Sequence, residues 1–443
     1  MTPLDASTTV VRLLFVGLLA ASCDRNSPPE STNGVPNVLL IVADDLGIAD
    51  VPGYGPQALP APSLARLAAE GVVHERAYAV ASVCSPARAG LLTARYPQRI
   101  GHENNTGDLT RQRREGIGLP LGVPTLATAL KARGYTTGLV GKWHLGASEP
   151  FHPLERGFDE FFGFLGGGHD YFVWDDPERG RILRGREPVD GEGYLTDALA
   201  DEAIAFLGRH ARDPFFLVFT PNAVHPPLQA PPDLEDGTLV NEAGQAYRAV
   251  FMGLDRALGR VLEELDRLEL TERTLIAFLG DNGGSEEHGA NNGALRSGKR
   301  SPYEGGLRIP LIVRFPGGER AGTTVGENVS ALDVSATILE LSGAELRADL
   351  APDGMDLSGP VPGDRALYWR QGRSRAVLQD DWKLVVRRQL DPELYDLDAD
   401  PGEASDVAAE NPEVVARLEA SYAAWDASTV PALWDWRVPG DDD

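Results

Sequence analysis

Residues 38–43 read VLLIVA, an unbroken apolar run that ends directly in the acidic pair at residues 44–45. A short run of this kind is typical of a strand that is buried on both faces of a parallel sheet. The same order returns at residues 274–279, TLIAFL, which lead through a glycine into the pair DN at residues 281–282. We therefore expect two buried strands, each with a pair of oxygen-bearing side chains at its carboxyl end.

Two further apolar runs have the same form. Residues 137–140 lead into GKWH at residues 141–144, and residues 215–219 lead into a loop that contains His225. Open α/β sheets bind ligands beyond the carboxyl ends of their strands. The four strand ends are therefore predicted to converge on one site.

Helical patterns alternate with these strands. Residues 63–70 and 125–133 have helical spacing and end near glycine, and residues 246–267 form an amphipathic pattern with alternating charges. Alternation from about residue 36 to residue 343 predicts an α/β fold, a doubly wound and mostly parallel sheet.

The chain divides into three predicted parts. Residues 1–35 form a leader and a flexible tether, and residues 36–345 form the catalytic α/β domain. Residues 346–443 form a small C-terminal α+β domain, because a stretch rich in Pro, Gly and Asp precedes strand-like segments at 366–369, 375–378 and 382–386 and a helix that ends near residue 425.

Composition limits the function. The 443 residues are 42% hydrophobic, which indicates a globular protein, and carry a formal net charge of -25. That charge repels polyanions and leaves no basic stripe, so a nucleic-acid partner is not expected. An anionic substrate would need a local basic pocket.

The first residues have the features of an export signal. Residues 13–21 are apolar but too few to span a bilayer, and Ser22-Cys23 follow them. Small residues before a cysteine resemble a bacterial lipoprotein cleavage site, in which a lipid on Cys23 would attach the protein to the membrane. We expect an exported protein, periplasmic or a membrane-anchored lipoprotein of a bacterium. An ordinary cleaved signal is the alternative.

The other cysteine of the chain, Cys84, opens the segment CSPAR at residues 84–88. Ser85 is predicted to cap a helix whose first residue is Pro86, which would place Cys84 beside free backbone N–H groups and the positive end of the helix dipole. Arg88, one turn later, could reach back towards it. This setting would favour an anion at residue 84, although a reactive or buried thiol at a helix start is the alternative.

Residues 84–88 match the C-x-P-x-R signature of type I sulfatases, and GYTTGLVGKWH at residues 134–144 resembles the second signature of that family. The chain thus resembles an arylsulfatase-like member of the alkaline phosphatase superfamily. The resemblance covers most of residues 36–425 and is weakest at residues 166–192 and 229–245, where family members vary their substrate loops.

The resemblance implies a chemistry for residue 84. A formylglycine-generating enzyme would oxidise Cys84 to formylglycine during maturation, and the hydrate of that aldehyde would attack sulfur. It also implies one Ca²⁺ per chain. Oxygen donors without histidine or thiolate favour a hard ion, Ca²⁺ before Mg²⁺, over zinc. The implied metal ligands are Asp44, Asp45, Asp281, Asn282 and the residue made from Cys84.

The resemblance also implies roles for the remaining site residues. Lys142 and Lys299 would bind the sulfate oxygens, and Arg88 and His144 would orient the hydrate. His225 would protonate the leaving alcohol, because imidazole titrates near neutral pH. Two further histidines beside glycine-rich segments, His169 and His288, could line the substrate entrance, although an incidental position in mobile loops is favoured for both.

The expected reaction is the hydrolysis of sulfate esters, on a sulfated carbohydrate rather than a steroid or a small aryl ester. One alternative is a phosphonate or phosphate ester hydrolase of the same superfamily. Another is a non-catalytic lipoprotein that binds sulfated glycans. Intact Arg88, Lys142, His144, His225 and Lys299 argue against a pure binding protein, which needs no acid for a leaving group.

Overall fold

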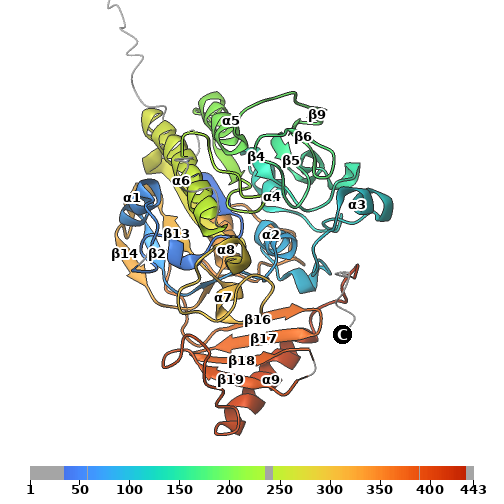
Figure 1. Ribbon diagram of the computed structural model, residues 1–443, viewed down its shortest axis with the longest axis vertical. Helices are drawn as coiled ribbons and strands as arrows, with labels where there is room; N and C mark the ends of the chain where they lie inside the picture. Colours follow the sequence, from blue (N-terminus) through green and yellow to red (C-terminus); the bar gives the residue numbers. More distant parts are fainter. Residues whose placement is uncertain (1–33, 57, 235–242, 389, 436–443) are drawn as a thin grey trace, which may run out of the picture. The chain divides into compact units, whose positions relative to one another are not determined.

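A ten-stranded sheet forms the centre of the fold, in the order β14-β2-β13-β11-β1-β10-β4-β5-β8-β9 (Figure 1). The structure is a computed structural model that describes residues 34–56, 58–234, 243–388 and 390–435. The predicted leader and Cys23 lie outside the described residues. The strands of this sheet are β1 (Asn37–Ala43), β2 (Val72–His74), β4 (Thr136–Lys142), β5 (Glu160–Phe164), β8 (Leu183–Arg184), β9 (Glu187–Pro188), β10 (Phe215–Thr220), β11 (Thr274–Gly280), β13 (Leu311–Arg314) and β14 (Thr323–Val325).

The predicted parallel core is confirmed. Strand β1 pairs in parallel with both β10 and β11, β10 pairs in parallel with β4, and β4 with β5. All seven residues of β1 are buried. Its side chains alternate between two apolar clusters, one on each face of the sheet: Val38 and Leu40 belong to the first, Leu39 and Ile41 to the second.

Helices cover both faces of this sheet. The cluster that contains Leu39 and Ile41 includes α1 (Pro62–Glu70), α5 (Leu195–Arg209) and α6 (Ala243–Arg267). The opposite cluster includes α2 (Cys84–Thr93), α4 (Leu126–Ala132) and α8 (Ala331–Ser342). Two helix layers around a mostly parallel sheet are the doubly wound α/β architecture that the sequence predicts. Among the described residues, no helix combines the length and the apolar character needed to cross a membrane.

A separate four-stranded sheet follows near the C-terminus (Figure 1). Its antiparallel strands are β16 (Ala366–Gln371), β17 (Ser374–Gln379), β18 (Trp382–Val386) and β19 (Glu393–Asp396), and α9 (Pro412–Asp426) packs on one face. The sequence predicts three of these strands and the helix, but not β19. The opposite face packs on Tyr78, Tyr303 and Leu307. This sheet and its helix match the predicted C-terminal fold, while the proposed division at residue 345 stays a prediction.

The remaining α-helices and strands of the described residues lie outside these two sheets. They are α3 (Leu109–Glu115), α7 (Glu304–Leu307), the small sheet of β3 (Ala77–Tyr78), β12 (Arg308–Ile309) and β15 (Val329–Ser330), and the hairpin of β6 (Asp175–Asp176) and β7 (Gly180–Arg181).

Candidate active site

The two acidic strand ends meet at one edge of the sheet, as predicted. Strands β1 and β11 pair in register to their last residues, Ala43 opposite Gly280, so the pairs that follow them lie side by side. The backbone N–H of Asp45 donates to Asp281 Oδ1 (3.2 Å), and Asn282 Nδ2 donates to Asp45 Oδ1 (2.9 Å). The position of each carboxylate is therefore set by the other strand.

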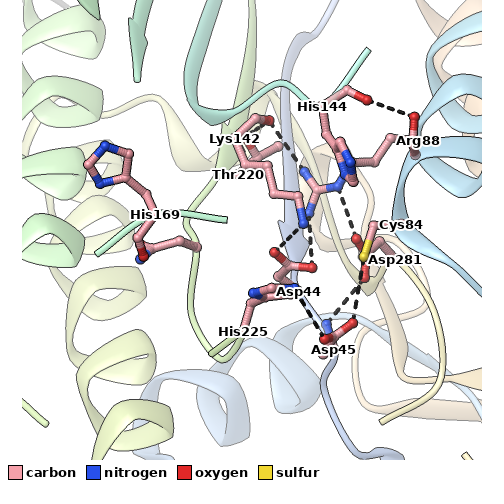
Figure 2. A network of polar contacts seen from close by, with 12 residues as sticks. Asp44, Asp45, Cys84, Arg88, Lys142, His144, His169, Thr220, His225 and Asp281 are labelled. Atoms are coloured by element: carbon pink, nitrogen blue, oxygen red, sulfur yellow. Dashed lines mark hydrogen bonds and ion pairs between the residues drawn. The ribbon is translucent and has the colours of Figure 1, made fainter. Parts of the chain in front are cut away.

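Cys84 completes this cluster (Figure 2). One ligand atom from each of Asp44, Asp45, Cys84 and Asp281 lies within 4.8 Å of the others, and all four residues are buried. In the described part of the chain, Asp44 Oδ1 and Asn282 Oδ1 are buried and have no hydrogen-bond partner. Buried oxygen atoms with free lone pairs, grouped with two further carboxylates, fit an oxygen-ligated cation such as Ca²⁺.

Helix α2 begins two residues earlier than predicted. Cys84 is its first residue and Val83 its N-cap, with no capping hydrogen bond from a side chain. Ser85 is not the cap, because its hydroxyl donates to the carbonyl of His144 (2.7 Å) and lies 2.7 Å from His102 Nε2. The backbone N–H of Ser85 donates to Asn105 Oδ1 (2.9 Å). Ser85 therefore joins the two signature segments to each other.

The unmodified thiol of Cys84 does not ionise readily at this position. The residue is buried, and its Sγ lies 3.7 Å from Asp45 Oδ1. Burial raises the pKa of Cys84 far above its ordinary value, and the charges of Lys142 and Lys299 do not compensate. Burial therefore outweighs the effect of the helix start on the unmodified thiol, and an anion on the modified residue 84 stays a prediction.

Three cations, Lys142, Lys299 and Arg88, lie beside the carboxylates of the cluster. Lys142 Nζ lies 2.6 Å from Asp44 Oδ2, and Lys299 Nζ lies 2.6 Å from Asp45 Oδ2. Burial alone would raise the pKa of Asp45, but the positive charges around it, that of Lys299 first, together outweigh burial and hold the pKa below its ordinary value. Burial, followed by the charge of Asp44, raises the pKa of Asp281 to about 6. The cations thus neutralise acidic groups that are otherwise costly to bury.

Arg88 differs from its predicted position. Its Nε donates to Asp281 Oδ2 (2.9 Å), and its Nη2 lies 3.8 Å from Asp44 Oδ1. A third guanidinium nitrogen donates to the carbonyl of Lys142 (3.3 Å). The side chain therefore stabilises the acidic cluster and the end of β4, and makes no hydrogen bond to Cys84.

Two of the predicted histidines lie at the cluster. His225 Nε2 lies 3.8 Å from Asp45 Oδ2, while its Nδ1 donates to the carbonyl of Pro226 (2.7 Å). Burial, then the charge of Lys142, lowers the pKa of His225 to about 3, so the ring is neutral in the substrate-free site. Burial lowers the pKa of His144 well below its ordinary value, and its Nδ1 has no hydrogen-bond partner among the described residues.

His169 and His288 have no catalytic position. His169 is buried away from the carboxylates (Figure 2) and makes hydrogen-bond contacts with the carbonyls of Asp170 (3.0 Å) and Gly180 (3.1 Å). His288 Nδ1 lies 2.8 Å from the hydroxyl of Ser285. Both findings agree with the favoured interpretation that these histidines are incidental to the chemistry, although His169 is structural rather than mobile.

Two groups that support the site were not predicted from the sequence. Thr220, at the end of β10, donates to the carbonyl of Lys142 (2.8 Å) and supports that strand end. Glu304 forms a buried ion pair with Lys383 of the C-terminal sheet (2.8 Å), which in turn pairs with Glu403 (2.9 Å). The position of Thr220 at a strand end is a local signal, but the three residues of the ion cluster are too far apart in the sequence to form a pattern.

The sheet, its helix layers and the C-terminal sheet define an enzyme of the alkaline phosphatase superfamily. Residues 36–344 match the family model described as Sulfatase, and the chain belongs to this family of sulfuric ester hydrolases. It is 34% identical over 397 residues to N-acetylgalactosamine-6-sulfatase of Canis lupus familiaris, with 83% of this chain and 73% of that protein covered.

Two further comparisons agree. Arylsulfatase A of Bos taurus is 31% identical over 493 residues, with 96% of this chain and 92% of that protein covered. The crystal structure of Ps i-CgsB in complex with k-i-k-neocarrahexaose superposes with a TM-score of 0.85 at 32% identity, covering 91% of this chain and 95% of that one. The similarity therefore extends over both sheets.

Proposed function

We propose that this sulfatase hydrolyses sulfate esters of carbohydrates, with a nucleophile made from Cys84 and with Ca²⁺ bound beside it. The observation that carries the proposal is the cluster of Asp44, Asp45, Cys84 and Asp281, within 4.8 Å of one another and next to two lysines. The carbohydrate substrate is supported by the names of two similar proteins, an N-acetylgalactosamine-6-sulfatase and a protein solved with a neocarrahexaose.

This reaction would require a modified residue 84, because a thiol has no second hydroxyl group that could expel the bound sulfate. Formylglycine would supply a hydrated aldehyde, in which one hydroxyl attacks sulfur and the other expels sulfate. Ca²⁺ would supply a positive charge that makes ionisation of a bound oxygen less costly. Asp44, Asp45, Asp281 and Asn282 would hold the ion, and Arg88 fixes the orientation of Asp281.

The two lysines are suited to binding the sulfate group. Lys142 Nζ lies 2.6 Å from Asp44 Oδ2, and Lys299 Nζ lies 2.6 Å from Asp45 Oδ2, the oxygen that also lies 3.8 Å from His225 Nε2. A bound sulfate would accept hydrogen bonds from these ammonium groups, which otherwise donate to Asp44 and Asp45. As the S–O bond breaks, negative charge grows on the oxygens, and fixed cations stabilise it more than they stabilise the ground state.

His225 is suited to donate the proton that the leaving alcohol requires. Its Nδ1 is used by the carbonyl of Pro226, which leaves Nε2 to face the cluster near Asp45. The ring is neutral without substrate, since burial and Lys142 lower its pKa. A sulfate ester brings a negative charge to the site and favours the protonated ring, so substrate binding would prepare the acid.

Sulfate release from sulfated mono- and oligosaccharides tests this proposal directly. The full chain, produced together with a formylglycine-generating enzyme, is expected to release sulfate. Cys84→Ala is expected to lose turnover, because Cys84 supplies the nucleophile. Production in a host without the modifying enzyme should give folded protein of very low activity.

Two alternatives give different results in the same assay. A phosphonate or phosphate ester hydrolase would prefer phosphonate monoesters over sulfate esters at equal concentration. A lipoprotein that only binds sulfated glycans would keep its full function in Cys84→Ala.

We also propose that the protein is exported and that a lipid on Cys23 anchors it in the membrane of a bacterium. The apolar stretch at residues 13–21 and the small residues before Cys23 support this proposal. Fractionation of a producing bacterium is the test. Membrane association that disappears in Cys23→Ala supports the anchor, and cytoplasmic recovery of the native chain contradicts export.

A further inference from the structure

A cavity of about 510 Å³ opens next to the reaction centre. His225 belongs both to its lining and to the catalytic cluster. The other lining residues come from four places: the N-terminal end of α3, the segment at residues 166–168, Glu178 and Arg179 of the β6–β7 hairpin, and Pro226 and Pro227 directly after His225. Among the described lining residues, Arg179 is the only arginine or lysine.

Two glycines of this segment pack against the catalytic histidines. A Cβ atom at Gly167 would lie 2.7 Å from His144 Nε2, and one at Gly168 would lie 3.0 Å from His225 Nδ1. A side chain at Gly167 would displace His144, and one at Gly168 would crowd His225. Because His225 faces both the cluster and the cavity, the alcohol part of a substrate whose sulfate occupies the cluster would lie in this cavity.

The hairpin holds Arg179 in position in the lining of the cavity. Asp176 Oδ1 accepts hydrogen bonds from the backbone N–H groups of Glu178 (2.8 Å) and Arg179 (3.0 Å). The other oxygen of Asp176 pairs with Arg179 Nη1 (3.0 Å). The hairpin is tied to the glycine segment, since His169 Nε2 lies 3.1 Å from the carbonyl of Gly180. Arg179 still exposes 38% of its side chain and has N–H groups left to donate.

Acidic groups outnumber the guanidinium in this cavity. Glu178, which is 84% exposed and lies 3.9 Å from Arg179, and Asp108 both line the cavity, and Asp176 pairs with the same guanidinium from outside the lining. A second sulfate on the substrate would face this net negative charge. Neutral hydroxyl groups are favoured instead, because they can accept from an arginine and donate to a carboxylate at the same time.

We propose that Arg179, together with Glu178, determines specificity by binding hydroxyl groups of the sugar that carries the scissile sulfate, and by excluding a second sulfate on that sugar. This inference rests on the proposed function. It adds to the sulfatase site a preference for monosulfated over disulfated sugar rings.

The test compares kcat/KM for three kinds of substrate. These are N-acetylgalactosamine 6-sulfate and a monosulfated neocarrabiose, the matching disulfated sugars, and 4-nitrophenyl sulfate, which has no sugar hydroxyl. One monosulfated sugar is chosen, the one that the wild-type protein cleaves with the higher kcat/KM. For this sugar, Arg179→Ala is expected to lower kcat/KM by about ten- to hundredfold, because one charge-assisted hydrogen bond is lost. Most of the change should be in KM. The loss on 4-nitrophenyl sulfate should be smaller by at least about tenfold.

Arg181→Ala is the matched control. Arg181 lies on the same hairpin with 41% exposure and pairs with Asp175 and Asp190, but does not line the cavity. It should change kcat/KM less than about threefold on every substrate. Glu178→Gln should raise activity on the disulfated sugar, relative to the monosulfated one, by about three- to tenfold.

The outcomes separate two kinds of failure. Equal losses for Arg179→Ala on the sugar and the aryl sulfate overturn the specificity role, as does wild-type protein that cleaves the aryl sulfate but neither monosulfated sugar. A wild-type preference for disulfated sugars also overturns it. Wild-type protein that cleaves none of the sulfate esters contradicts the proposed function itself.

Discussion

Replacement of Lys383 by methionine tests how much the buried ion cluster of the C-terminal sheet contributes to the free energy of unfolding. Lys383 Nζ lies 2.8 Å from Glu304 Oε1 and 2.9 Å from Glu403 Oε1, and none of the three side chains is exposed. The backbone N–H of Glu304 donates to Glu403 Oε2 (2.6 Å). Lys383→Met leaves two buried carboxylates without their shared cation, and the loss of one partner of a buried ion pair costs about 3–5 kcal/mol.

That cost is large against a total free energy of unfolding of about 5–15 kcal/mol for a typical domain. Urea unfolding followed by tryptophan fluorescence measures it. Lys131→Met is the control, because Lys131 pairs with Asp159 at 2.6 Å but is 49% exposed, and an exposed pair contributes at most about 1 kcal/mol. If both variants lose less than about 1 kcal/mol, the buried ion cluster does not hold the two sheets together as argued.

Three further predictions concern the metal, the acid and the pH dependence. Chelation should lower sulfatase activity, and Ca²⁺ should restore it better than Zn²⁺ because the ligands are oxygens; two zinc ions per chain by metal analysis would contradict this. His225→Ala should cost about a hundredfold to ten-thousandfold on a sugar sulfate and far less on an aryl sulfate, which leaves without protonation; equal losses would remove its role as acid. Burial lowers the pKa of His74 to about 4 from an ordinary value of 6.5. Below pH 6.5 the ring binds a proton in the unfolded chain before it does so in the folded protein, so the free energy of unfolding falls as the pH falls from 6.5 towards 4. His74→Leu should therefore reduce the loss of unfolding free energy between pH 7.5 and pH 5 by about 2 kcal/mol, and an unchanged loss would be inconsistent with the buried neutral ring.

The strand ends of the site could be predicted because their signal is local. Buried parallel strands are continuous apolar runs, and the acidic residues that follow β1 and β11 must meet once those strands pair. Strand β19 was missed because residues 393–396 read ELYD, in which only two residues are apolar.

The details at Cys84 depend on contacts that the sequence does not reveal. Ser85 has the residue type of a helix cap, but the carbonyl of His144, brought close by β4, takes its hydroxyl. Arg88 has the spacing to reach Cys84, but the carboxylate of Asp281 is nearby and attracts the guanidinium. In both cases a tertiary partner outweighs a local preference.

The glycine segment shows the same limit. Residues 166–168 read GGG, which predicts a mobile loop, yet Gly167 and Gly168 lie against the rings of His144 and His225, where a side chain would be crowded. A run of glycines indicates a flexible backbone. In the structure, glycine instead occupies these positions because there is little space for a side chain.

The state of residue 84 in active protein tests the central claim most directly. Peptide mass analysis of the purified, sulfate-releasing enzyme should find formylglycine at residue 84, lighter than cysteine, and the modified fraction should rise and fall with specific activity across preparations. Full sulfatase activity in protein whose residue 84 is entirely unmodified cysteine would contradict the account.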